Sequence, residues 1–235
     1  MENSAVNRNT LAAIAPKLAE LTETVLFGDI WARRDLSPRE RSLITLSALT
    51  ALGKTQQLPW HIALGYQNGL SQAEIVELFT HLAFYAGWGN AIAAAAVTKE
   101  IFLQKGINAE QLPRAEEALL PIDEKAEVAR AARVEQSIGS AAPGLVSDTT
   151  DVLFRELWLG PGVAPPDRSL VTLSALIANG QVQQIPPHLN RAMDNGLTRQ
   201  QASGALSHLA YYTGWPNAFS AAPVFKTVFE QRESK

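Results

Sequence analysis

The chain carries one stretch of sequence twice, and this duplication limits the possible folds more than any other feature. A shift of 127 residues superimposes positions 27–99 on positions 154–226 without a gap, and 32 of the 73 aligned pairs are identical. The phrase QQLPWH at residues 56–61 returns as QQIPPH at residues 183–188. We therefore expect two copies of one structural unit of about 90 residues.

The register divides the chain into three segments. Residues 1–103 hold the first repeat with a preceding helix, residues 104–139 join the repeats, and residues 140–235 hold the second repeat. The joining segment is charged and rich in alanine, which predicts a helical linker with a break at Pro121.

Helix signals dominate both repeats, and strand signals are weak. Residues 40–52, ERSLITLSALTAL, place apolar side chains at helical spacing, and Gly53 is suited to end that helix. Pro59 fits the first turn of the next helix, where its missing N–H is not needed. Ser71 and Glu74 form the pattern of a capping box that opens a third helix. These patterns predict an all-α fold of two helical bundles with short turns.

The composition excludes several classes of function. The 235 residues include no cysteine, so disulfides, thiolate nucleophiles and cysteine-bound metals are ruled out. The formal net charge is −3 without a basic patch, and we expect no nucleic-acid partner and no membrane partner. The most apolar run, residues 91–97, is far shorter than the roughly 20 residues of a membrane-spanning helix. The first residues lack the pattern of a secretory signal, and we expect a cytoplasmic protein.

Several phrases carry a close resemblance to the carboxymuconolactone decarboxylase family. In the first copy they are GDIW at residues 28–31, RSLITL at 41–46, Leu58 with His61, NGL at 68–70, EIVE at 74–77 and YAGW at 85–88. The second copy matches the same frame with DRSLVTLSAL, QQIPPH, DNGLT and HLAYYTGWPNA. The resemblance implies two tandem copies of that family's helical bundle, a small carboxylated lactone as substrate, and no cofactor. It also implies a homo-oligomer, a trimer of chains that imitates a hexamer of single units.

A second branch of the same superfamily resembles alkylhydroperoxidase D, which needs a CxxC pair and a histidine. Only the histidine carries over, onto His61 and His188. In the first repeat the cysteine positions hold Lys54 and Gln57. Without a thiol pair, peroxide reduction of that kind is excluded.

His61 and His188 are the leading candidates for catalysis. Each follows a proline near the start of a helix, and the family histidine falls on both positions. Decarboxylation leaves an electron pair that must be delocalised and a carbon that must receive a proton, which a histidine can supply as general acid. The structural alternative is a half-buried imidazole that is satisfied by a neighbouring carbonyl group.

Arg41 and Arg168 open one helix in each repeat. A guanidinium group can hold a substrate carboxylate by two hydrogen bonds. A structural salt bridge, for example to Asp29 or Glu156, is the equal alternative.

Four further polar residues are candidates for the site. Glu40 and Asp167 precede the two arginines, where a negative charge suits a helix N-terminus and a catalytic carboxylate is the alternative. Gln57 and Gln184 could donate hydrogen bonds to a substrate carboxylate, or they could be solvated residues in front of a helix.

The third helix of each repeat carries a histidine and aromatic residues. His81 and His208 lie in apolar runs, where a hydrogen bond between helices is expected and a pocket role is the alternative. Tyr85 and Trp88 could line a substrate pocket. The first expectation is core packing for Tyr85, and core packing or a subunit contact for Trp88. Two histidines per repeat with a carboxylate could bind zinc, but no close spacing such as HExxH is present, and we predict no metal.

The favoured function is the decarboxylation or isomerisation of a small carboxylated lactone or related carbonyl compound without a cofactor. Two alternatives stay open: a non-catalytic helical oligomer or ligand-binding protein with structural histidines, and a cyclase or tailoring enzyme of a biosynthetic pathway. The first copy stays nearer to the family's pattern, since Trp60 becomes Pro187 and Glu77 becomes Gly204. We therefore expect the His61 pocket to be the more active one.

Overall fold

Residues 8–114 and 118–234 are described by a computed structural model, and every regular element in this part is a helix. The first repeat contains α1 (Arg8–Ile14), α2 (Pro16–Leu21), α3 (Pro38–Ala51), α4 (Leu58–Gln67), α5 (Gln72–Ala86) and α6 (Trp88–Gln104). The second repeat contains α8 (Pro143–Asp148), α9 (Pro165–Ala178), α10 (Ile185–Asp194), α11 (Arg199–Thr213) and α12 (Trp215–Glu233). Each of the five begins 127 residues after its counterpart in the first repeat, so the all-α prediction and the register are confirmed.

The helix boundaries follow from local chemistry. Ser71 and Glu74 form the predicted capping box at the start of α5, and Thr198 with Gln201 does the same for α11. Gly87 is the one residue between α5 and α6, and its φ of 90° is a backbone conformation that favours glycine. These two signals place the start and the end of α5 from sequence alone.

The joining segment was predicted to be helical with a break at Pro121, and a long helix is found only after that break. Among its described residues, the regular structure that follows the short 3₁₀ turn at Ala109–Gln111 is α7 (Glu124–Ile138), so the prediction is wrong for the described residues just before Pro121. Pro121 lies just before that helix, and the side chain of Asp123 caps it by accepting a hydrogen bond from the backbone N–H of Ala126. Proline lacks the N–H that a helix interior needs and restricts the residue before it, so the helix begins only after Pro121.

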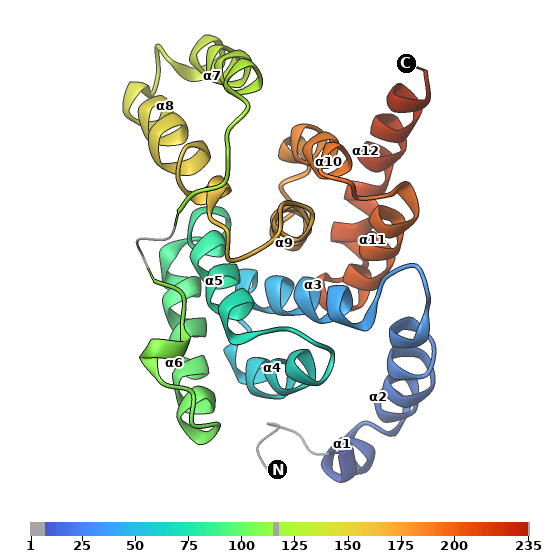
Figure 1. Ribbon diagram of the computed structural model, residues 1–235. Helices are drawn as coiled ribbons and strands as arrows, with labels where there is room; N and C mark the ends of the chain where they lie inside the picture. The colour runs from blue at the N-terminus through green and yellow to red at the C-terminus, as the bar shows by residue number, and fades with distance from the viewer. Residues whose placement is uncertain (1–7, 115–117, 235) are drawn as a thin grey trace.

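The centre of the molecule is formed by α3 and α9, which pack against each other (Figure 1). Residues 41–51 of α3 and 167–178 of α9 are all buried. In addition, α5 of the first repeat packs on α9, and α11 of the second repeat packs on α3. A continuous cluster of buried apolar side chains runs through these helices, so the two repeats share one core.

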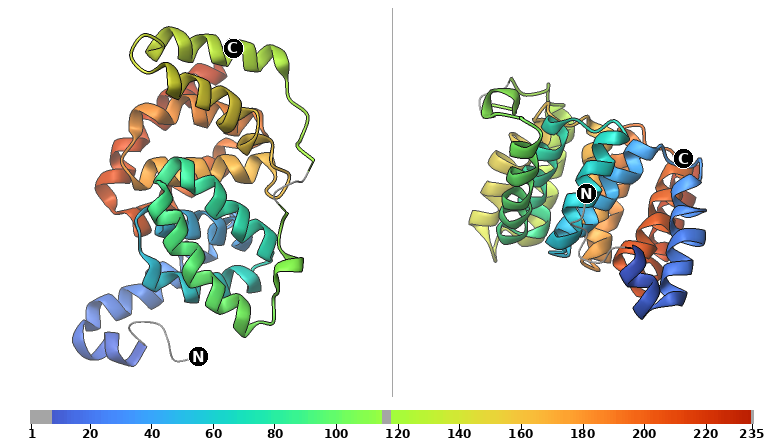
Figure 2. Two further views of the ribbon diagram at one scale, coloured as in Figure 1. Left: turned by 90° about the vertical axis from the view of Figure 1, so that its left-hand side faces the viewer. Right: turned by 90° about the horizontal axis from the view of Figure 1, so that it is seen from below.

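The helices that precede the central part of each repeat lie at opposite ends of the molecule. Figures 1 and 2 show α1 and α2 at one end and α7 and α8 at the other. The short 3₁₀ turns that follow, Ile30–Ala32 and Leu157–Leu159, bring Trp31 and Trp158 against the other repeat. Among the described helices, none is both long and apolar enough to cross a membrane.

Candidate active site

Two clusters of aromatic and polar side chains lie between the repeats, and each takes residues from both. The His61 cluster consists of Trp31, Arg41, Thr45, Trp60 and His61 from the first repeat with His208 and Tyr212 from the second. The His188 cluster is its counterpart and consists of Trp158, Arg168, Thr172 and His188 with His81 and Tyr85.

In the His61 cluster, the imidazole of His61 lies among three aromatic rings. Its centroid is 5.5 Å from that of Tyr212, 6.3 Å from that of Trp31 and 4.7 Å from that of Trp60. The indole N–H of Trp31 donates a hydrogen bond of 2.9 Å to the hydroxyl oxygen of Tyr212. The candidate acid–base residue of one repeat is therefore positioned against a tyrosine of the other.

The His188 cluster has the same arrangement with one ring fewer. The centroid of His188 is 5.3 Å from that of Tyr85 and 6.0 Å from that of Trp158. The indole N–H of Trp158 donates to the Tyr85 hydroxyl at 2.8 Å. Pro187 stands where the first repeat has Trp60, so the third ring is missing and the two histidines face different surroundings.

His208 is fixed by two hydrogen bonds between helices, as expected. Its Nδ1 lies 3.2 Å from Nη1 of Arg41, and its Nε2 lies 2.7 Å from Oγ1 of Thr45. Because a guanidinium group can only donate, Nδ1 must accept, and the ring proton of the neutral imidazole is on Nε2 and points to Thr45. His81 repeats this arrangement with Arg168 and Thr172 at 3.3 Å and 2.6 Å.

His61 and His188 are neutral at pH 7. Burial lowers the pKa of His61 to about 4, and burial with the charge of Arg191 lowers that of His188 to about 4. In both rings Nδ1 is buried and has no hydrogen-bond partner among the described residues. Nε2 of either ring is not among these buried, unpartnered atoms. Each imidazole can therefore accept a proton, and it can act as a general acid only after it has taken one up.

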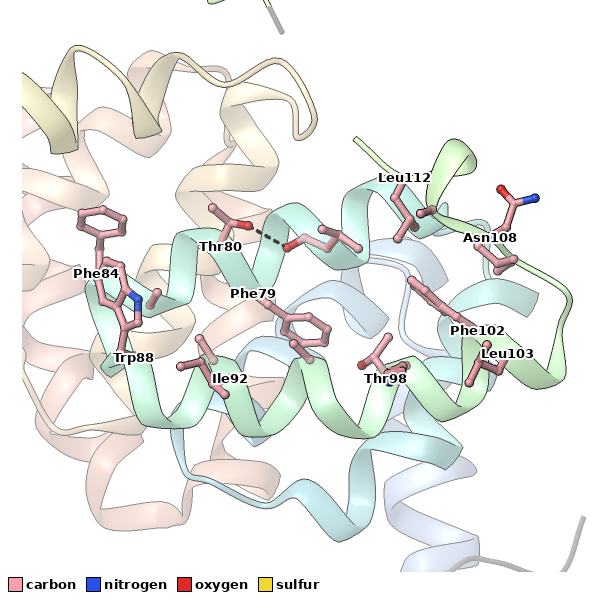
Figure 3. A pocket seen from close by; sticks show the side chains of 17 residues that line it. Phe79, Thr80, Phe84, Trp88, Ile92, Thr98, Phe102, Leu103, Asn108 and Leu112 are labelled. Atoms are coloured by element: carbon pink, nitrogen blue, oxygen red, sulfur yellow. Dashed lines mark hydrogen bonds between the residues drawn. The ribbon is translucent and has the colours of Figure 1, made fainter. Parts of the chain in front are cut away.

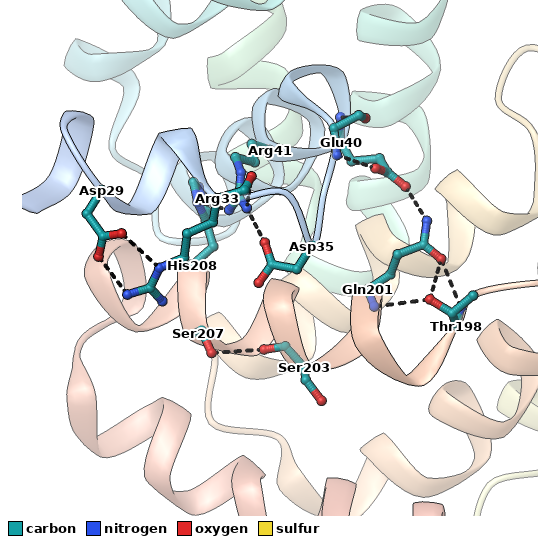
Figure 4. Close-up of polar contacts among 11 residues, drawn as sticks. Asp29, Arg33, Asp35, Glu40, Arg41, Thr198, Gln201, Ser203, Ser207 and His208 are labelled. Atoms are coloured by element: carbon teal, nitrogen blue, oxygen red, sulfur yellow. Dashed lines mark hydrogen bonds and ion pairs between the residues drawn. The ribbon is translucent and has the colours of Figure 1, made fainter.

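Arg41 is buried within the His61 cluster, and its guanidinium forms hydrogen bonds with other groups of the protein. Its Nη2 donates to the carboxylate of Asp35 and, at 2.9 Å, to the carbonyl oxygen of Arg33 (Figure 4). The suggested partner Asp29 binds Arg33 instead, so that salt-bridge suggestion is corrected. These contacts favour the structural alternative for Arg41.

Arg168 is held in the same way. Its Nη2 donates to the carbonyl oxygen of Gly160 at 2.8 Å and lies 3.5 Å from a carboxylate oxygen of Glu77, rather than pairing with Glu156. Side-chain exposure is 1% for each of the two arginines. The role of Arg41 and Arg168 in substrate binding stays a prediction.

Each buried arginine has one neighbouring carboxylate, but the two clusters take it from different positions of the repeat. At the position that supplies the carboxylate in one cluster, the other cluster has a glycine. In the His61 cluster the carboxylate is Asp35, from the loop before α3, and Gly204 of α11 lies opposite. In the His188 cluster the carboxylate is Glu77 of α5, and Gly162, at the loop position equivalent to Asp35, lies opposite. A Cβ atom on Gly204 would lie 2.6 Å from Cγ of Asp35, so the glycine makes room for the carboxylate.

The model of the carboxymuconolactone decarboxylase family matches the chain twice, over residues 16–100 and 143–227. The chain belongs to the carboxymuconolactone decarboxylase family. A 4-carboxymuconolactone decarboxylase from Acinetobacter baylyi is 35% identical over 86 residues, which are 37% of this chain and 64% of that protein. The nitrosuccinic acid decarboxylase npaB from Metarhizium robertsii is 31% identical over 93 residues, which are 40% of this chain and 64% of that protein. This chain thus spans somewhat less than two thirds of each relative's length.

A solved structure supports the fold of this decarboxylase-family chain. It comes from Burkholderia xenovorans and is described as a gamma-carboxymuconolactone decarboxylase subunit. The TM-score is 0.58 with 16% sequence identity, and the match covers 95% of this chain and 90% of that one. Both repeats and their arrangement therefore fall within one known fold.

In this family member, the two predicted carboxylates join the repeats. Glu40 and Asp167 lie in the first turns of α3 and α9, as expected for charges at helix N-termini. Glu40 accepts hydrogen bonds from the backbone of Ser37 and from the side chain of Gln201 (Figure 4). Asp167 accepts one from Arg39 at 2.8 Å. Both carboxylates are engaged outside the two clusters, and a catalytic role for them stays a prediction.

Three other predicted residues do not join the clusters. Gln57 and Gln184 are exposed in the 3₁₀ turns before α4 and α10. Trp88 is 57% exposed and lines an apolar groove of about 770 Å³ between α5, α6 and residues 107–112 (Figure 3). Tyr85 is the one residue of the predicted Tyr–Trp pair that contacts a candidate catalytic histidine.

The combination of residues across the repeats was missed by the sequence analysis. His61 contacts Tyr212 of the second repeat, whose ring stacks on His208, and the two histidines of one repeat lie in different clusters. The grouping of one repeat's two histidines that a zinc site would need is therefore not formed. Among the described residues, no group of three or more His, Asp and Glu side chains could hold a metal ion.

Proposed function

We propose that this chain decarboxylates, or isomerises, a small carboxylated lactone or related carbonyl compound at the two inter-repeat clusters without a cofactor. The observation that carries the proposal is the placement, in each cluster, of a neutral imidazole against a tryptophan of its own repeat and a tyrosine of the other repeat. The imidazole is buried in His61 and half-buried in His188. The similarity to two decarboxylases supports the reaction type. The lack of cysteine argues against a thiol-dependent peroxidase reaction.

Binding of a carboxylated substrate would favour protonation of the histidine. A carboxylate that binds within a few ångströms of an imidazole favours the charged form and raises its pKa. In the free protein His61 is neutral because it is buried, so a carboxylated substrate would bind together with a proton. The proton is then held beside the carbon that needs it.

The reaction then balances without another reactant. The bond between the carbon skeleton and one carboxylate breaks, CO₂ leaves, and the electron pair is delocalised into the adjacent unsaturated carbonyl system. The protonated imidazole of His61 or His188 delivers its proton to the carbon and returns to the neutral form, which its burial favours. The isomerisation uses the same group to remove and return a proton at carbon.

Release of CO₂ from carboxylated lactones tests the proposal. We expect His61→Ala and His188→Ala each to remove part of the activity, and the double variant to lose it by a factor of about 100 or more, the range for general acid–base groups. Ser207→Ala is a matched control, because the hydroxyl of this exposed residue of α11 donates its hydrogen bond to the backbone carbonyl oxygen of Ser203 in its own helix. Full activity in the folded double variant would contradict the proposal.

We also propose that the chain forms a homo-oligomer through the exposed aromatic ridges of both repeats. Trp88 and Ile92 of α6 are 57% and 62% exposed, and their counterparts Trp215 and Phe219 of α12 are 51% and 69% exposed. Contiguous exposed apolar surface of this kind is typical of protein contacts. A trimer by light scattering that dissociates in Trp88→Asp would support the assembly, and a wild-type monomer at micromolar concentration would contradict it.

A further inference from the structure

A second, smaller pocket lies between the joining segment and the second repeat. It has a volume of about 390 Å³ and is lined on one side by residues 120–127 and on the other by Phe154, Trp158 and Arg191. The backbone N–H of Leu120 donates to the carbonyl oxygen of Leu159 at 2.7 Å, which holds the joining segment over the pocket. The volume is within the range of small-molecule sites.

Arg191 is the basic residue among those that line this pocket. Its guanidinium lies 4.7 Å from the ring centroid of Phe154 and 4.9 Å from that of Trp158. Neither a hydrogen bond nor an ion pair of this guanidinium is made with any of the described residues. The carboxylates of Glu127 and Asp194 act on Arg191 through their charge but do not contact it. A partly buried guanidinium is stabilised by a hydrogen-bonded anion, so its N–H groups are suited to bind one as a ligand.

The acidic residues that line the pocket are already engaged. Glu127 makes two hydrogen bonds with Arg130, at 2.9 Å and 2.6 Å. Asp123 caps α7 by accepting a hydrogen bond from the backbone N–H of Ala126. Neither carboxylate pairs with Arg191, so its two-pronged donor face is left for a ligand.

The arginine of this site has no equivalent in the first repeat. Arg191 lies one turn after His188 on α10, and the matching position one turn after His61 is Leu64. Trp158 forms a wall of the pocket and also stacks on His188. The pocket thus adjoins the His188 cluster, and the His61 cluster has a leucine in place of its arginine.

We propose that this pocket binds the carboxylate of a small organic anion through a bidentate contact with Arg191. The stacked rings of Phe154 and Trp158 hold the guanidinium in place, and the joining segment covers the rest of the ligand. Residues 120–127 therefore act as a wall of a binding site in addition to linking the repeats. The proposal goes beyond the decarboxylase reaction, because it holds whether or not His188 transfers a proton.

Calorimetric titration with succinate tests the site, with the uncharged diamide succinamide as the matched ligand. We expect saturable binding of succinate to the intact chain and none of succinamide. Arg191→Leu, which installs the residue of the first repeat, should weaken succinate binding by about tenfold or more, because hydrogen bonds to charged groups are strong. Arg191→Lys keeps the charge but not the paired donors and should bind with intermediate affinity.

The control is Arg199→Leu, which removes another arginine of the second repeat, one that is exposed and paired with Glu233. It should bind succinate like the wild type. Thermal unfolding of every variant separates loss of the site from loss of the fold. Absence of saturable binding, equal binding of succinamide, or unchanged affinity in Arg191→Leu would overturn the proposal. Because binding is measured without turnover, its failure is distinct from a failure of the decarboxylase proposal.

Discussion

The His61 cluster has Asp35 and Gly204 where the His188 cluster has Gly162 and Glu77. Two substitutions, Asp35→Gly and Gly204→Glu, would give Arg41 the surroundings of Arg168. Asp35→Gly removes the counter-ion of Arg41, whose side chain is 1% exposed. Loss of one partner from a buried pair costs about 3 kcal/mol, at the low end of the range because Asp35 itself is 24% exposed. Gly204→Glu adds a side chain where Asp35 already lies 2.6 Å from the new Cβ, and overpacking of this kind costs about 2 kcal/mol.

The double variant should recover most of this loss. It recreates around Arg41 the arrangement that Glu77 and Gly162 provide around Arg168. We expect its free energy of unfolding to lie within about 1–2 kcal/mol of the wild type, whereas independent effects would sum to about 5 kcal/mol. Urea denaturation of the four proteins at one chain concentration measures this coupling. Losses that add to within about 0.5 kcal/mol would refute the exchange.

Three further expectations follow from the buried polar groups. Because the pKa of His61 is about 4 when folded and 6.5 when free, the unfolded chain binds more protons below pH 6.5, and stability falls as the pH is lowered towards 4. From pH 7 to pH 5 the wild type should lose about 2 kcal/mol more than His61→Gln in urea denaturation, and equal losses would contradict the buried neutral imidazole. Tyr212→Phe leaves the indole N–H of Trp31 without its acceptor and should lower the free energy of unfolding by about 1–2 kcal/mol, whereas Tyr66→Phe, whose hydroxyl is buried without a partner, should not. Thr172→Val removes the acceptor of the ring N–H of His81 and should cost about 2 kcal/mol, as a buried donor is left unpaired, which denaturation against the wild type would show.

Much of the fold could be predicted because its signals are local. The capping box of Ser71 and Glu74 and the break at Gly87 act within a few residues, and they place α5 correctly. The register of the repeat then transfers each element to the second half of the chain. The joining segment was harder to predict, because alanine and charge favour a helix while Pro121 delays its start until Glu124.

The composition of the clusters could not be predicted from one sequence. The register shows that His61 and His188 are equivalent, but it does not show whether His61 meets Tyr85 of its own repeat or Tyr212 of the other. That choice depends on how α5 and α11 cross the central helices, which is a property of tertiary packing. For the same reason the sequence could not show which nearby acidic residue is the counter-ion of Arg41. Arg191 departs from the register, but that departure alone does not indicate a binding site.

The positions of the carboxylates make the two halves complementary rather than interchangeable. Asp35 and Glu77 both belong to the first half, and Gly162 and Gly204 both belong to the second. A symmetric pair of first halves would place two acidic side chains at each buried arginine, and a symmetric pair of second halves would place none. Each buried arginine therefore has one carboxylate only when a first half packs against a second half. A separate first half would have to lose an acidic residue, and a separate second half would have to gain one, before it could form such a pair with its own copy. The division of charge thus favours the pairing of a first half with a second half over the pairing of two like halves.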